Sequence, residues 1–242
     1  MSEMVCLERW RVSRAGLHAR RRIDGFDLER PWAPRGTEGG RKEGIIVARP
    51  RQFDEKKVLQ AAMNCFWANG YEMTSTRELA VRMGLTGASL YNAFGDKRSL
   101  YRQALAYYLE HSVHERIRRL ENGQEPLPAI RAFFNEIIER SVRDRQRRGC
   151  MLVNAALDVA PHDSELRKCV SQELILIESF FERRVAEGQM DGSIACDRSA
   201  ADLATMLLSV LLGIRVLART RPQRSVLEAA VQAAIASLSV TV

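Results

Sequence analysis

The chain has 242 residues, of which 46% are hydrophobic and 28% are charged, and its formal net charge is +7. This composition is typical of a soluble globular protein with a sizeable core. We expect no membrane span, because the most apolar run, residues 203–217, is short and contains Arg215, and no secretory signal, because the first 30 residues contain no apolar segment. The net charge is +3 in residues 1–48, +3 in residues 49–98 and +1 in residues 99–242. A basic N-terminal part favours phosphate binding there.

Neither the cysteines nor the histidines form a recognisable site. The cysteines are odd in number, widely spaced and without a Cys-x-x-Cys pair, which argues against a disulfide framework and a structural metal and favours the reducing cytosol. The sequence has no Gly-rich phosphate loop and no nucleophile elbow. We therefore predict no enzyme activity, no metal and no cofactor. The residues considered are Cys6, Cys65, Cys150, Cys169 and Cys196 with His18, His111, His114 and His162.

Residues 1–48 differ from the rest of the chain. They contain three consecutive arginines at 20–22 and a stretch rich in proline and glycine at 31–40, and no apolar periodicity persists. We interpret them as a disordered basic extension. Two explanations remain open, namely an arm that contacts DNA and a mis-assigned start of translation, with Val47 as the first true residue.

From Phe53 onward the apolar residues recur at helical spacing. Asp54 precedes the first helix as its N-cap, and Gly70 ends it. Ser75 and Glu78 have the spacing of a capping box at the start of a second, short helix. That helix ends at Gly84, and a third begins after Thr86. Two short helices joined by a tight turn that contains glycine form a helix-turn-helix.

The second helix of such a motif lies in the major groove of DNA. Here it begins after Thr86, and Leu90 and Phe94 are predicted to face inward. Small and polar residues are left to face DNA, where serine, tyrosine and asparagine donate to phosphates or base edges. The residues predicted to face DNA from this helix are Gly87, Ala88, Ser89, Tyr91 and Asn92.

Residues 50–101 closely resemble the DNA-binding domain of the TetR family of transcription regulators, and the spacing of the matching positions contains no gap. One departure is Asn92-Ala93, where the family often has a second hydroxyl or glycine and an aromatic or histidine, so base preference does not transfer. The matching residues are Ala61, Ala62, Phe66, Gly70, Tyr71, Thr74, Thr76, Glu78, Leu79, Ala80, Met83, Gly84, Leu85, Ser89, Leu90, Tyr91, Phe94, Asp96, Lys97 and Leu100.

The resemblance implies an all-α protein: a three-helix DNA-binding domain at 49–98, then a helical effector-binding and dimerisation domain at 99–242. It also implies a homodimer on double-stranded operator DNA and a small-molecule effector. By position, the residues that would contact DNA are Thr76, Arg77, Thr86, Gly87, Ala88, Ser89, Tyr91, Asn92 and Lys97.

The remaining sequence is also helical in period, and one of the predicted helices ends at Gly188. The segment 148–157 resembles a Gly-Cys-x-x-x-Asn stretch that lines the effector pocket in some TetR-like regulators. This implies pocket roles for Phe134, Met151 and Asn154, with core packing as the alternative for each. Cys150 follows two arginines near a helix N-terminus, so a thiol that senses oxidants is a second interpretation beside a buried, inert cysteine.

The last two long helices carry small and apolar residues on one face, and we expect them to form the dimer interface as a four-helix contact. The function predicted is that of a repressor, released from a pseudo-palindromic operator by a small molecule. Activation, a purely thiol-based sensor and a helical scaffold without DNA binding are the alternatives. The expected location is the bacterial cytoplasm, at the nucleoid. The residues of the two faces are Ala201, Ala204, Leu208, Leu211 and Leu212, then Leu227, Ala230, Ala234 and Leu238.

Overall fold

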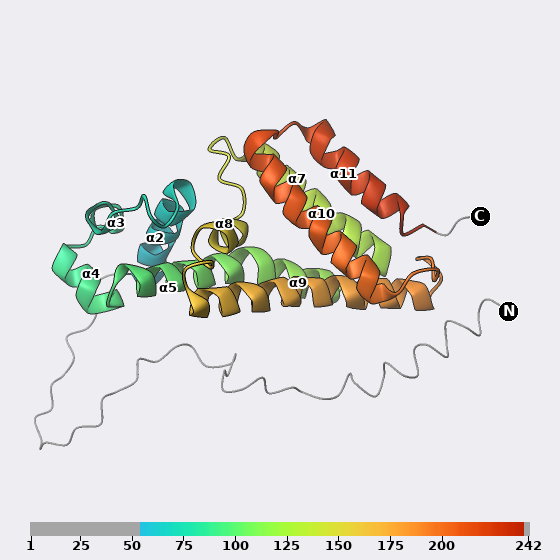
Figure 1. Cartoon of the computed structure of the whole chain (residues 1–242), viewed down its shortest axis with the longest axis horizontal. Helices are drawn as coiled ribbons and strands as arrows, with labels where there is room; N and C mark the ends of the chain where they lie inside the picture. The colour runs from blue at the N-terminus through green and yellow to red at the C-terminus, as the bar shows by residue number, and fades with distance from the viewer. Residues whose placement is uncertain (1–53, 240–242) are drawn as a thin grey trace, which may run out of the picture. The chain divides into compact units, whose positions relative to one another are not determined.

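A computed structural model describes residues 54–239, and the predicted extension at 1–48 lies outside them. The described residues are all helical, as the sequence predicts, and Figure 1 shows their arrangement. The helices are α2 (Glu55–Asn69), α3 (Thr76–Met83), α4 (Gly87–Phe94), α5 (Lys97–Leu109), the π-helical turn η1 (Glu110–His114), α6 (Glu115–Glu121), α7 (Pro126–Arg143), α8 (Met151–Asp158), α9 (Ser164–Met190), α10 (Ala200–Thr220) and α11 (Arg224–Ala236).

The first helices begin and end where the sequence predicts. The side chains of Asp54, Ser75 and Thr86 each accept a hydrogen bond from a backbone N–H in the first turn of the helix that follows. Each of these caps contributes about 1 kcal/mol to helix stability. Gly84 ends α3 with φ +66°, a left-handed conformation that suits glycine. The Glu78 carboxylate, the other half of the predicted capping box, accepts a hydrogen bond from the Asn69 amide at 3.0 Å.

Helices α2 to α5 form one small cluster at one end of the described body (Figure 1). Helix α2 packs against α3 and α5, and α4 packs against α3 and α5. Leu79 of α3, Leu90 of α4 and Leu100 of α5 are completely buried where these helices meet. The apolar faces of the two short helices are thereby turned inward, and their polar faces remain on the surface.

Helices α5 and α6 follow each other directly and are joined by a π-helical turn. Residues Glu110–His114 form this turn, and helical geometry resumes at Glu115. A π-helical turn is rare and places an extra residue in the helix. The helical periodicity of the sequence gives no sign of this inserted turn.

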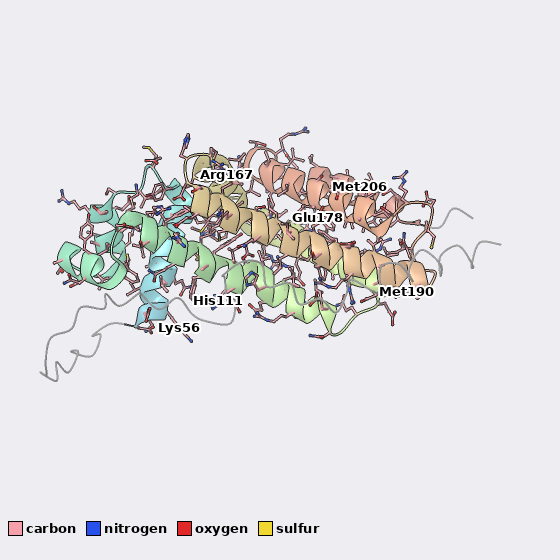
Figure 2. All side chains as sticks on the ribbon, turned by 60° about the horizontal axis from the view of Figure 1, so that its bottom comes forward. Lys56, His111, Arg167, Glu178, Met190 and Met206 are labelled. Atoms are coloured by element: carbon pink, nitrogen blue, oxygen red, sulfur yellow. The ribbon has the colours of Figure 1, made fainter. Side chains whose placement is uncertain are left out.

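The other helices pack around a core of aromatic residues. Phe133 and Phe134 of α7 meet Phe180 and Phe181 of α9, with ring centroids 5.0 to 5.5 Å apart across the helix pair, and all four side chains are buried. Helix α10 packs against α9, α7 and α11, while α8 packs against α5, α9 and α10. Figure 2 shows Glu178 of α9 beside α10, where it accepts a hydrogen bond from Thr205 at 2.6 Å. Helix α8 therefore lies between the first helices and the rest.

The predicted helix end at Gly188 is wrong, because α9 continues to Met190. Gly188 is buried inside the helix, and a Cβ atom there would lie 2.6 Å from Cδ1 of Ile194. The glycine at this position permits close approach of Ile194 and does not stop the helix. The left-handed glycine in this turn is Gly192, with φ +79°.

Among the described residues one helix, α10, is long and apolar enough to cross a membrane by length and composition, with 33% of the window buried. Its packing between α9, α7 and α11 is that of a core helix in a helical bundle. Arg215 lies in this helix and is itself buried, with 7% of its surface exposed.

Candidate nucleic-acid interface and adjoining cavity

Helix α4 presents a polar and aromatic surface to solvent. Leu90 and Phe94 anchor it inward, being buried, while Gly87, Ala88 and Asn92 are exposed. Tyr91 has half of its surface exposed. A short helix with small residues at its start and donors along its outer face can approach a major groove closely. The structure thus brings together, on one face, the α4 residues that the sequence predicts.

The start of α4 is held by two hydroxyl groups. Thr86 Oγ1 accepts a hydrogen bond from the Ser89 backbone N–H at 3.1 Å and donates to Ser89 Oγ at 2.9 Å. Both hydroxyls are therefore fixed at the N-terminus of the helix, where backbone N–H groups favour an anion such as phosphate. Thr76 and Arg77 occupy the first turn of α3, with Arg77 exposed and Thr76 half-buried.

Lys97 lies at the start of α5 and is engaged within the protein. Its Nζ atom is 4.4 Å from the ring centroid of Tyr71 and donates a hydrogen bond to the backbone carbonyl of Glu72 at 3.4 Å. The side chain is half-buried. Lys97 therefore has a defined position beside the helix-turn-helix, and its contact with a phosphate stays a prediction.

A cavity of about 470 Å³ lies next to this cluster of helices. Its walls come from α2, the junction of α5 and η1, the end of α7, the segment 144–149 and the end of α10. His111 on η1, labelled in Figure 2, lines it, and its Nδ1 is 2.8 Å from the backbone oxygen of Tyr107. Cavities that hold small molecules are commonly about 300 to 1,000 Å³. This one is large enough for such a ligand and includes residues of the first helix.

Asn154 of α8 holds one wall of the cavity in place. Its Nδ2 donates to the backbone oxygen of Arg148 at 3.2 Å, and its Oδ1 accepts from Arg219 at 3.0 Å. Arg148 in turn places its guanidinium 4.0 Å from the ring centroid of Trp67 and is paired with Asp144. Asn154 is thus a positioning residue for the segment that covers Trp67 of α2.

The other predicted pocket residues lie in the core. Phe134 is completely buried and stacks on Phe181 with 5.5 Å between the ring centroids, and Met151 is also buried. Within the described part of the chain, the large cavity and a smaller one beside it are not lined by Phe134, Met151 or Asn154. Their roles in effector binding stay predictions.

Cys150 occupies the N-cap position of α8 without a side-chain capping hydrogen bond, and it is buried, with 6% of its surface exposed. Its Sγ atom accepts a hydrogen bond from the Tyr108 hydroxyl at 3.5 Å. Burial and the neighbouring Cys150 raise the pKa of the Tyr108 hydroxyl, so this tyrosine stays neutral and keeps its proton.

The sequence does not predict several of the residues that line the cavity. Trp67 belongs to the periodic apolar face of the first helix, and Ser141 interrupts the apolar face of α7 without a motif. Among these cavity residues, Arg215 is the one that the sequence marks as unusual, because it is a single charged residue in the most apolar run of the chain. A buried arginine requires a partner or a polar cavity beside it.

Two family models match the chain. Residues 58–104 match the model described as bacterial regulatory proteins, tetR family, and residues 126–234 match the tetracyclin repressor-like C-terminal domain. The chain is 31% identical over 178 residues to the uncharacterized HTH-type transcriptional regulator YezE of Bacillus subtilis (strain 168), which is 72% of this chain and 90% of that protein. It is 25% identical over 172 residues to the HTH-type transcriptional repressor ComR of Escherichia coli (strain K12), covering 71% of this chain and 82% of the relative.

Among solved structures, a cysteine mutant of the TetR family transcriptional regulator CifR, complexed with a 26-bp double-strand operator DNA, superimposes with a TM-score of 0.70. Its sequence is 35% identical, and the superposition covers 78% of this chain and 99% of that one.

Proposed function

The chain belongs to the TetR family of DNA-binding transcription regulators, which are not enzymes, and from this premise we propose that it is a repressor released from its operator by a small molecule. The exposed face of α4, set on the buried anchors Leu90 and Phe94, is the observation that carries DNA recognition by this chain. The cavity beside α2 supports control by a ligand, because an occupant there would contact the DNA-binding helices directly.

The proposed contacts with DNA divide into two kinds. Tyr91 and Asn92 lie on the exposed face of α4 and would contact base edges or phosphates in the major groove. Arg77, Lys97 and the N-terminus of α4 would contact phosphates and fix the register of the helix on the duplex. The remaining proposed contacts are Thr76, Thr86, Gly87, Ala88 and Ser89.

A dimer is part of the proposal, because recognition of a pseudo-palindromic operator requires two α4 helices about 34–36 Å apart. Helix α10 supports it with an apolar row, in which Leu208 and Leu212 are half-buried and Val216 has 46% of its surface exposed. Other residues of the predicted stripes, such as Leu211 and Leu227, are buried inside the protomer. The proposed interface is therefore the outer face of α10 together with α11.

The effector is proposed to act by a population shift. A ligand that binds more tightly to a dimer with altered spacing of the α4 helices lowers operator affinity by the ratio of its two affinities. The cellular location that goes with this function is the bacterial cytoplasm, with the protein bound to the nucleoid.

The test is a salt-titrated gel shift of the full chain on DNA from upstream of its own gene. Asn92→Ala should weaken binding by about 1–3 kcal/mol if Asn92 contacts a base. The matched control is Asn135→Ala, because Asn135 is an exposed asparagine on α7, remote in sequence from α4. Arg77→Ala should weaken binding to all sequences and reduce the salt slope by about 1. A folded protein that binds no fragment in a genome-wide selection would contradict the proposal and leave the scaffold alternative.

A further inference from the structure

The cavity beside α2 is lined by an excess of positive charge. Five arginines and one carboxylate, Asp144, contribute to its walls. Asp144 is already engaged, since its carboxylate accepts hydrogen bonds from the backbone and side chain of Arg148. The five arginines are Arg140, Arg143, Arg147, Arg148 and Arg215.

Three of these arginines lack an acidic partner, namely Arg140, Arg147 and Arg215. Among residues 54–239 no carboxylate lies within ion-pair distance of any of the three. Arg140 is exposed, whereas Arg215 is buried in the middle of α10. A buried charge without a partner is unfavourable, and Arg215 is therefore a candidate for binding the negative charge of a ligand.

Arg215 is also one wall of a second, much smaller cavity of about 20 Å³. The other residues that line this small cavity are mostly apolar. The second charged residue among them is Arg116 of α6, whose side chain is buried with 3% of the residue surface exposed. Burial and the nearby charges of Arg215 and Arg140 lower the pKa of Arg116 to about 10. Glu136 pairs with Arg116 at 3.1 Å and also with Arg119, so positive charge remains in excess at this junction.

Buried hydrogen-bond donors without a partner lie in the same place. Within the described part of the chain four buried side-chain atoms have no hydrogen-bond partner, and two of them, Trp67 Nε1 and Ser141 Oγ, belong to residues that line the larger cavity. A third, Arg116 Nη2, belongs to the wall of the smaller one. All three atoms can donate a hydrogen bond, and native proteins rarely leave such atoms unsatisfied. Together with the arginines they describe a site for a group that accepts hydrogen bonds and carries negative charge.

Aromatic rings form the remaining surface of the larger cavity. Trp67 and Tyr108 lie with their ring centroids 5.0 Å apart, and Tyr107 and His111 stack on each other at 4.1 Å. Rings of this kind bind the apolar or aromatic body of a ligand, while a few polar groups orient it. The cavity therefore combines a flat apolar surface with a cationic end.

We propose that this cavity binds a small organic acid, whose carboxylate contacts Arg215, Arg140 and Ser141 and whose apolar body lies against Trp67 and Tyr108. The inference rests on the proposed function in one respect only, namely that the occupant is the effector. Because Trp67 is part of α2, the bound acid touches the helix that packs against α3 and α5 of the DNA-binding cluster. Asn154 and Arg148 act as positioning residues for this contact.

Trp67 provides a direct readout of binding. The chain has three tryptophans, and replacing the other two by Trp10→Phe and Trp32→Phe leaves Trp67 as the sole fluorophore of its kind. In this background we expect a saturable change of tryptophan fluorescence on titration with benzoate and with octanoate. Benzamide, which has nearly the same shape without the charge, should bind at least tenfold more weakly. Inorganic phosphate, which has the charge without the body, should also bind at least tenfold more weakly.

Three variants test the residues. Arg215→Gln should weaken benzoate binding at least tenfold, and Ser141→Ala and Arg140→Gln should each weaken it severalfold. Ser141→Ala removes a single atom and Arg140 is exposed, so these two variants keep the test valid even if Arg215→Gln fails to fold. The matched control is Arg131→Gln, because Arg131 is exposed on the same helix as Arg140 and does not line the cavity. Benzoate binding by this variant should equal that of the parent.

Four results would overturn the inference: no saturable change with either acid, equal binding of benzamide, equal or tighter binding of phosphate, or unaltered benzoate binding by the Ser141 and Arg140 variants. Operator binding is measured separately, without any acid present. A protein that binds its operator but no acid refutes the organic-acid site and leaves the regulator standing. A protein that binds benzoate through Ser141 and Arg140 but binds no DNA supports the site and refutes the proposed function.

Discussion

Arg98 at the start of α5 donates two hydrogen bonds to the carboxylate of Asp163, and Asp163 is the residue that caps α9. The Nη2 atom of Arg98 lies 2.8 Å from Asp163 Oδ1 and 3.0 Å from Glu165 Oε2. Arg102, one turn further along α5, also pairs with Glu165 at 2.7 Å. These contacts connect the helix that follows the helix-turn-helix to the start of the longest helix in the other part of the body.

The Asp163 carboxylate has two separable roles. It accepts hydrogen bonds from the backbone N–H groups of Glu165 and Leu166 as the cap of α9, and it pairs with Arg98. Asp163→Ala removes both roles and should lower the free energy of unfolding by about 1–2 kcal/mol for the cap, plus the contribution of the pair. Asp163→Asn keeps a capping oxygen and should cost less. Urea denaturation at fixed protein concentration measures both, and equal losses for the two variants would show that the cap contributes nothing.

His114 predicts a dependence of stability on pH. Its Nε2 lies 2.7 Å from Glu173 of α9 and its Nδ1 lies 3.0 Å from Glu110, and these contacts raise the pKa of the imidazole although burial opposes them. The protonated ring is thus favoured in the folded protein. Its stabilising contribution is complete below the unfolded pKa of about 6.5 and is lost as pH rises through the folded pKa, at about 1.4 kcal/mol for each unit of the shift.

The difference in unfolding free energy between the parent and His114→Gln measures this contribution. We expect it to be largest near pH 6 and to decrease steadily toward pH 9. A difference that stays constant across this range would mean that the two carboxylates do not hold the proton on His114.

Gly188 and Ile194 form a close contact that a methyl group would destroy. In an ordinary helix interior, replacing glycine by alanine stabilises by about 1 kcal/mol. At Gly188 the new Cβ would lie 2.6 Å from Cδ1 and 2.7 Å from Cγ1 of the buried Ile194, so Gly188→Ala should destabilise by about 1–3 kcal/mol. Ile194→Ala alone should cost about 2–5 kcal/mol. The double variant should lose less than the two single variants together, and strict additivity in thermal unfolding would contradict the contact.

Local signals in the sequence are sufficient for the DNA-binding cluster. Asp54, Ser75 and Thr86 cap their helices as predicted, because a cap depends on residues two or three positions away. The inward direction of Leu90 and Phe94 follows from a spacing of four residues, and both are buried. The predicted DNA-facing residues of α4 share one surface for the same reason, although their contacts with DNA stay predictions.

Non-local contacts explain what the sequence could not provide. The sequence predicts that Gly188 ends a helix. Its actual role, which is to permit the close approach of Ile194, depends on a contact that only the folded chain makes. The cavity joins Trp67, Ser141 and Arg215, which come from three helices far apart in the chain, so no spacing connects them. The boundary predicted between residues 98 and 99 stays a prediction. It falls inside α5, which begins at Lys97 and packs against α2.

Burial favours the interpretation of Cys150 as an inert cysteine, and the rate of labelling tests it. Only 6% of its surface is exposed, whereas Cys196 is exposed. Because a buried thiol reacts only when the structure opens locally, we expect Cys150 to react with a maleimide roughly a hundredfold more slowly than Cys196. Mass spectrometry of peptides after timed labelling measures the two rates, and unfolding in urea should make them similar. Rapid labelling of Cys150 in the native protein would favour the oxidant-sensing alternative instead.

The outer face of α10 indicates how the proposed dimer can be broken. Leu208, Leu212 and Val216 are four residues apart and lie on one side of the helix, and Val216 remains 46% exposed in the protomer. A carboxylate at the centre of an apolar interface between two copies cannot be hydrated, so Val216→Asp should weaken dimerisation by several kcal/mol. Leu157→Asp on α8, where the leucine is 65% exposed, is the matched control and should leave dimerisation unchanged. Sedimentation velocity over a range of concentrations measures both. If Val216→Asp remains as dimeric as the parent, the two-fold contact must be made by a different face, and the spacing of the α4 helices would then be set by that face.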